Sequence, residues 1–258
     1  MIAGVRSELL KIRTTAVPWV LAGVAVVLEG LVILGTFLGN RTAGGGYQVP
    51  SSTQELRNLL GSGFRGQGYL FALLLGVLII TTEFRHKTVT TSFLVTPRRW
   101  AFVTAKLVTS ALLGVVLAIL LLVVALVGGG ITLSARGGSF SGLVHQIPAV
   151  APGMILVFAL FAVLGVGIGS ILTNQVAAII TCLGWFIIGE TILVGLVHSA
   201  YRWTPTGAGD AASNLTRGNR GGDTFLIFNW WQGTLLMLAY GIGFALIGSY
   251  ILSRRDIT

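Results

Sequence analysis

The chain has 258 residues, of which 54% are hydrophobic and only 10% are charged, and its formal net charge is +9. Ordinary soluble domains carry about 25% charged residues, so the composition excludes a typical water-soluble enzyme. The long unbroken apolar runs also exclude a β-barrel, whose strands alternate apolar and polar side chains. We therefore expect an all-α, multi-pass membrane protein, because helices satisfy every backbone group within lipid.

Six apolar stretches have about the length needed to cross roughly 30 Å of hydrocarbon as helices. The second stretch is short and reaches a more usual length if it begins near Phe64. Together the six stretches form one transmembrane domain. The expected spans are residues 17–38, 68–82, 101–127, 149–172, 176–199 and 231–252.

Residues 1–16 precede the first span and combine an apolar stripe with separate basic residues. Ile2, Val5 and Leu9 recur at helical spacing on one face, which favours an amphipathic helix lying on the membrane surface. A simple positively charged tail is the alternative. Trp19 then marks the start of the first span, because tryptophan is favoured at the membrane interface.

The first loop beyond the membrane contains a helix-start signal. Ser and Thr residues at 51–53 are followed by Glu55 and then by Leu-Arg-Asn-Leu-Leu, which ends at Leu60. A hydroxyl side chain followed three residues later by glutamate is typical of a capped helix N-terminus.

The segment between the second and third spans is polar, basic and bounded by charges. We expect it to form a short cytoplasmic helix parallel to the membrane and stopped by a proline, a shape suited to a groove on a cytosolic partner. Lys106 follows one turn into the third span, where its long side chain can extend to the membrane surface. The residues that we single out are Glu83, Arg85, Lys87, Thr88, Pro97, Arg98 and Arg99.

The distribution of basic residues predicts the orientation. Nine of the 17 Lys and Arg residues lie in the short segments on the side of the termini, and seven lie in the much longer segments on the other side. By the positive-inside rule the short segments, and with them both termini, are cytoplasmic. The positive charge is thereby explained without a nucleic-acid partner.

The segment between the second and third spans resembles the corresponding segment in the permease subunits of ABC-2-type bacterial ABC exporters. This group includes drug-resistance and sodium-efflux permeases. The family pattern runs approximately E-x-R-x-G-T, then a hydrophobic helix, then P-x-R and A-K. This sequence has Glu83-Phe-Arg85-His-Lys87-Thr88, Pro97-Arg98-Arg99 and Ala105-Lys106, with Lys87 where glycine is usual. The N-terminal Glu8-Leu-Leu-Lys11 and the terminal Ser253-Arg-Arg-Asp256 are also similar to the family.

The resemblance implies a coupling helix at about 84–96 that docks on a separate ABC ATP-binding subunit. It also implies a permease dimer, formed with itself or with a paralogue, among the lipids of the bacterial cytoplasmic membrane. ATP and Mg²⁺ belong to the partner, because the chain has no G-x-x-x-x-G-K-[ST] phosphate loop. The implied activity is export, and the large apolar interior favours an amphiphilic drug, lipid or peptide as cargo. The alternative is a non-transporting membrane anchor, such as an immunity or sensor component that binds a cytosolic partner.

Glu29 and Glu190 lie inside the first and fifth expected spans, at similar depths just past the middle. Intramembrane carboxylates are costly and often functional. They either line a wet translocation path that attracts a cation, or are protonated and hydrogen-bonded as part of the structure.

Other patterns favour structure over chemistry. Gly165, Gly167 and Gly169 lie within the fourth span, where we expect them to permit close helix packing. Cys182, the single cysteine, is expected to be buried and inert. The scattered histidines predict no metal site, and no nucleophile and base lie at matching depth, so we expect no enzyme activity.

The last outer segment, 200–230, is rich in Gly and Asn at its centre and aromatic at both ends. The aromatic residues indicate either an ordinary interfacial belt or a segment that turns back into the membrane. The second arrangement requires that protein buries the backbone.

Overall fold

The structure is a computed structural model that describes residues 8, 10, 13–39, 50, 52–85, 99–172, 174–215 and 228–254. These residues form helices and no strand, so the expected all-α fold is confirmed for them. They include six helical segments that are long and apolar enough to cross a membrane. The six are α2 (Ala16–Gly39), α5 (Gly68–Arg85), α7 (Arg99–Ala135), α9 (Ile147–Ile171), the segment Gln175–Leu196 and α13 (Trp230–Arg254).

Shorter elements make up the rest of the described chain. Segment Gln175–Leu196 is itself built from three pieces, α10 (Gln175–Leu183), the π-helical turn η1 (Gly184–Gly189) and α11 (Glu190–Leu196). The remaining elements are α3 (Thr53–Leu60), α4 (Ser62–Arg65), α8 (Phe140–Val144), the 3₁₀ helix η2 (His198–Trp203) and α12 (Pro205–Ala212).

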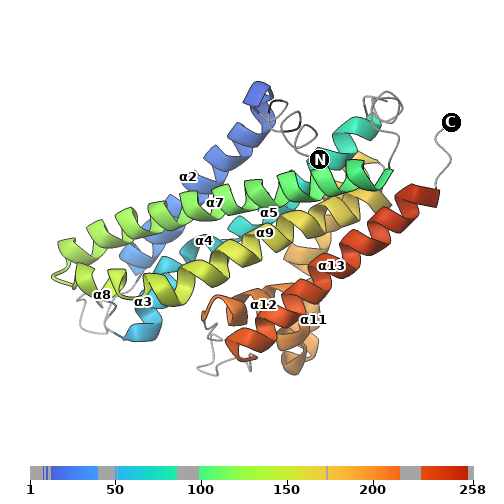
Figure 1. Ribbon diagram of the computed structural model, residues 1–258. Coiled ribbons are helices and arrows are strands. Elements are labelled where there is room, and N and C mark those ends of the chain that lie inside the picture. Colours follow the sequence, from blue (N-terminus) through green and yellow to red (C-terminus); the bar gives the residue numbers. More distant parts are fainter. Residues whose placement is uncertain are drawn as a thin grey trace.

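Helix α9 lies at the centre of the bundle, against α5, α7 and α13 (Figure 1). Glycines permit this close approach. A Cβ atom on Gly165 would lie 2.0 Å from the carbonyl oxygen of Leu73 in α5, and one on Gly167 would lie 2.6 Å from the backbone of Phe244 in α13. Gly169 meets α5 again. The expectation that these three glycines pack helices is confirmed, in keeping with the small residues typical of membrane helix contacts.

Helix α7 is longer than predicted, because it continues through three consecutive glycines that we placed in a loop. Tertiary contacts explain the continuation. A Cβ atom on Gly129 would lie 3.2 Å from the Leu59 side chain, and one on Gly130 would lie 2.6 Å from the Phe140 ring. The glycines therefore let α3 and α8 pack on α7, and this contact outweighs their poor helix propensity.

Helix α3 begins at the predicted signal. Ser52 is the N-cap, its hydroxyl accepts a hydrogen bond from the Glu55 amide at 3.2 Å, and its own amide donates to the Glu55 carboxylate at 3.1 Å. This reciprocal pair is a capping box. The predicted helix start is confirmed.

Segment 200–230 folds back against the bundle as far as it is described. Residues 206–212 of α12 are all buried. Close contacts hold them, because Cβ atoms on Gly153 of α9 and Gly233 of α13 would lie 2.0 and 2.6 Å from α12 carbonyl oxygens. Protein therefore buries the backbone of α12, which is the condition for a segment that turns back into the membrane.

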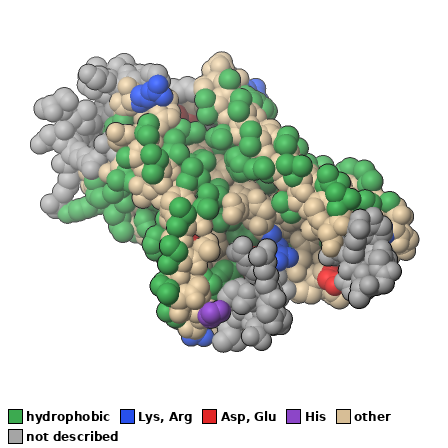
Figure 2. Space-filling model, turned by 180° about the vertical axis from the view of Figure 1, so that it is seen from behind, with side chains coloured by type: hydrophobic (Ala, Val, Ile, Leu, Met, Phe, Trp, Pro, Cys, Tyr) green, Lys and Arg blue, Asp and Glu red, His purple; other side chains and the backbone are tan. Residues whose placement is uncertain are grey.

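Apolar side chains are spread over the described part of the visible face of the bundle, where charged side chains appear at only a few places (Figure 2). Helix α2, whose first turns stand away from the bundle (Figure 1), exposes Trp19 and Val27 by 64% and 62%. Surface this apolar is unfavourable in water and suited to lipid. The described residues are thus those of a multi-pass membrane protein.

Candidate functional site

The expected coupling segment is described only at its two edges. Arg85 ends α5 and is exposed, and Nη1 of its guanidinium lies 3.5 Å from Oε1 of Gln175 at the start of α10. Residue Arg99 begins α7. Lys87, Thr88, Pro97 and Arg98, and with them nearly all of the expected helix 84–96, lie outside the described residues. That helix and the interfacial helix over 1–16 therefore stay predictions.

A buried charge cluster lies at the base of this segment. Lys106 Nζ is 2.7 Å from Glu83 Oε1 and 3.2 Å from Glu8 Oε2, and it also donates to the carbonyl oxygen of Ile79 at 3.2 Å. The three hydrogens of the ammonium group thus have three acceptors. Lys106 is almost completely buried, so the expectation that it extends to the membrane surface is wrong, because these acceptors hold it inside.

The cluster connects segments that are far apart in the sequence. Glu83 lies in the last turns of α5, Lys106 lies near the start of α7, and Glu8 belongs to the N-terminal segment. Glu83 and Glu8 are only 6% and 9% exposed. Removing one partner from a buried ion pair leaves an uncompensated charge and typically costs about 3–5 kcal/mol. Buried ion pairs therefore connect the end of α5 and the start of α7, which flank segment 86–98, to each other and to Glu8.

Glu29 is buried, with 2% of its surface exposed. Its Oε1 atom lies 2.5 Å from the Ser62 hydroxyl of α4, and that hydroxyl also lies 2.7 Å from the carbonyl oxygen of Leu59. Because a hydroxyl has one hydrogen, both contacts are hydrogen bonds at once only when the carboxyl group carries a proton. Glu29 is thus hydrogen-bonded within the protein through Oε1, while its Oε2 atom is buried without a hydrogen-bond partner among the described residues.

Glu190 follows the π-helical turn η1, and its carboxylate accepts a hydrogen bond from Thr206 of α12. A π-helical turn places one extra residue in the helix, and such turns are frequent at functional sites. Glu190 is 5% exposed, although most of the fifth span around it faces outward. The turn therefore accompanies a side chain directed into the protein.

A cavity of about 260 Å³ lies beside Glu190. Its described lining includes the aromatic residues Tyr69, Phe186 and Tyr201 but no Lys or Arg. A carboxylate among aromatic rings suits an organic cation, since ring faces attract positive charge. Glu190 thus differs from Glu29, which is not among the residues that line the cavity beside Ser62.

Asp210 of α12 is a buried carboxylate that the sequence reasoning missed. It is 2% exposed and accepts a hydrogen bond from the hydroxyl of Tyr201, which lines the Glu190 cavity. The available signal was an acidic residue within a run of small residues, Thr206-Gly-Ala-Gly-Asp210-Ala-Ala. Within the described ranges, no three His, Cys, Asp or Glu side chains gather closely enough to hold a metal ion.

No protein-family model matches the chain, and no curated protein matches it.

Proposed function

We propose that the chain is the permease subunit of an ABC-2-type exporter in the bacterial cytoplasmic membrane. ATP hydrolysis in a separate nucleotide-binding subunit drives it, and its cargo is an amphiphilic drug, lipid or peptide. The observation that carries the proposal is the buried contact of Glu83, Lys106 and Glu8 at the base of the segment with exporter-like motifs.

The cluster gives Glu83 a role different from direct docking. A side chain that is 6% exposed and paired with Lys106 offers little surface to a partner. Arg85, which is exposed, suits contact with the ATPase. The ion pair between Glu83 and Lys106 instead connects the end of α5 to the start of α7, on either side of segment 86–98. A displacement of this segment therefore moves both helices together.

Close helix packing connects α5 and α7 to α9 at the centre of the bundle. Helices α5 and α7 both contact α9 at glycines, since a Cβ atom on Gly76 or Gly114 would lie 1.9 or 2.5 Å from an α9 carbonyl oxygen. Interfaces this close shift between discrete arrangements and do not deform continuously. The spans therefore move as bodies, and nucleotide drives the movement only through its different affinities for two states of the assembly.

Glu190 and its cavity are the candidate place for cargo. The described cavity has a carboxylate, aromatic walls and hydroxyl groups, a combination that recognises an apolar body with a polar or cationic end. Glu29 stays a candidate for the path through its contact with Ser62, but its geometry favours a structural role.

The test is ATP turnover by the permease reconstituted in lipid with the ATPase encoded beside it, while amphiphilic compounds are scanned as stimulants. We expect a stable complex and compound-stimulated turnover. Glu83→Gln should weaken the stimulation while the complex persists, and Glu55→Gln, which alters a carboxylate at the other end of the bundle, should not. A stable complex whose turnover ignores every compound and Glu83→Gln would favour a membrane anchor. Failure to form any complex would contradict the proposal that the segment at about 84–96 docks on the ATPase.

A further inference from the structure

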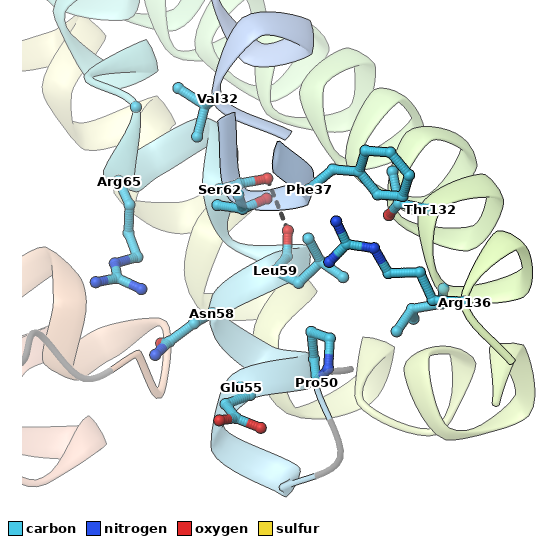
Figure 3. A pocket seen from close by; sticks show the side chains of 13 residues that line it. Val32, Phe37, Pro50, Glu55, Asn58, Leu59, Ser62, Arg65, Thr132 and Arg136 are labelled. Atoms are coloured by element: carbon cyan, nitrogen blue, oxygen red, sulfur yellow. Dashed lines mark hydrogen bonds between the residues drawn. The ribbon is translucent and has the colours of Figure 1, made fainter. Parts of the chain in front are cut away.

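A second cavity, of about 400 Å³, lies between α2, α4 and α7 (Figure 3). It is at the end of the bundle where α3 and α8 lie, away from the ends of α5 and α13 that carry Arg85 and Arg254 (Figure 1). Its lining includes two arginines, Arg65 and Arg136, and one glutamate, Glu55. The cavity is thus bordered by basic side chains as well as by Glu55, whereas the described lining beside Glu190 contains no Lys or Arg.

Arg136 is the cation directed into this cavity. Its Cζ atom lies 3.9 Å from the centre of the Phe37 ring, and the ring face holds the guanidinium by a cation–π contact. Figure 3 shows the guanidinium pointing from α7 toward Ser62 and Leu59 in the middle of the cavity, whereas Arg65 points away on the other side of α4. The contact with Phe37 thus holds the positive charge of Arg136 at one position in the cavity.

Two hydroxyl oxygens beside Arg136 are left as acceptors. Thr36 donates its hydroxyl hydrogen to the Ile33 carbonyl oxygen at 2.7 Å, and Thr132 donates to that of Gly129 at 2.9 Å. With their hydrogens used within their own helices, both oxygens can accept from a ligand. The cavity therefore offers a cation for an anion and acceptors for hydroxyl groups.

The remaining wall is apolar, with Val32, Leu59 and Leu133 among its lining residues. Helix α2, which forms one side, exposes Leu31 and Leu38 by 56% and 51%. A ligand whose polar head enters the cavity can lay an apolar chain along this helix. A soluble phosphate or sugar would leave that surface unused.

We propose that this cavity binds the headgroup of an anionic phospholipid of the surrounding membrane, with the phosphate on Arg136. Arginine binds phosphate oxygens through paired, charge-assisted hydrogen bonds. A headgroup with free hydroxyls, such as that of phosphatidylglycerol, also uses the oxygens of Thr36 and Thr132. The site is separate from the Glu190 cavity, and its occupancy does not depend on the transport proposal.

The test is native mass spectrometry of the full-length permease released from nanodiscs that contain equal amounts of phosphatidylglycerol and phosphatidylethanolamine. We expect the protein to retain phosphatidylglycerol with about a tenfold preference, the size given by one hydrogen bond to a charged group. Arg136→Gln should abolish the preference. Arg57→Gln is the matched control, because it removes a positive charge from the neighbouring helix α3 at a residue that contacts Gln146 instead of this cavity.

A second variant separates binding from misfolding. Thr132→Phe fills the cavity without changing its charge and should also abolish retention, while the apparent Tm of each variant reports its folding. Equal retention of the two lipids by the wild type, or unchanged preference in folded Arg136→Gln, would overturn the proposal. Displacement of the lipid by millimolar glycerol phosphate would show that the site recognises a soluble headgroup, and would overturn the assignment to a membrane lipid.

Discussion

Replacing Lys106 by Met should destabilise the protein strongly, because it removes the buried ammonium group that Glu83 and Glu8 both contact. Lys106 Nζ lies 2.7 and 3.2 Å from the two carboxylates, and its side chain is 1% exposed. Loss of one member of a buried ion pair costs about 3–5 kcal/mol. At about 2–4 °C per kcal/mol for a chain of this size, the apparent Tm should fall by roughly 6–20 °C.

The assay is thermal unfolding of the purified permease in lipid nanodiscs, followed by the fraction that remains monodisperse. The triple variant Lys106→Met, Glu83→Gln, Glu8→Gln should recover much of the loss, since a buried ion pair exchanged for neutral groups is often nearly neutral in stability. Double-mutant cycles then give the coupling of each pair. A loss below about 1 kcal/mol for Lys106→Met, or no recovery in the triple variant, would refute the buried cluster.

Three further variants test other parts of the structure. Glu190→Gln should lower compound-stimulated ATP turnover about tenfold, whereas Glu29→Gln should leave it within about twofold; the reverse order would contradict the two assignments. Gly165→Val should prevent close packing of α5 on α9, because its Cβ atom would lie 2.0 Å from a carbonyl oxygen, and size-exclusion profiles of the expressed protein should show the loss of folded material. Ser52→Ala should lower stability by only about 1 kcal/mol, the usual loss for an N-cap, and a loss of several kcal/mol would mean that α3 is held differently.

The spans were predictable because their signal is local. Length and hydropathy locate each apolar run without knowledge of its neighbours, and the cap at Ser52 depends on residues three apart. The end of α7 was missed because the neighbours of Gly129 and Gly130 decide it. A run of three glycines predicts a loop until α3 and α8 are packed against them.

The charge cluster could not be predicted, because its members are distant in the sequence. Glu8 and Lys106 are 98 positions apart, and nothing local indicates that they meet. The sequence showed Lys106 one turn inside a span, where extension to the surface and pairing inside the protein are both possible. Only the arrangement of α5 and α7 decides between them.

The two intramembrane carboxylates illustrate the same limit. Their depth in the spans predicted that Glu29 and Glu190 are special, but not that they differ. The difference arises from the elements that fold back, because α4 gives Glu29 the Ser62 hydroxyl and α12 gives Glu190 the Thr206 hydroxyl beside a cavity. Asp210 was missed for the same reason, since it becomes buried only when α12 packs between α9 and α13.

The most direct test of the proposed function is transport itself, measured in inverted vesicles that contain the permease and its ATPase. A fluorescent organic cation that stimulates ATP turnover should accumulate inside the vesicles only when ATP is present. The rate of accumulation should fall with Glu83→Gln and about tenfold with Glu190→Gln, in protein that still assembles with the ATPase. Equal distribution of the compound with and without ATP, in a complex that hydrolyses ATP normally, would contradict an exporter and leave a membrane anchor as the function.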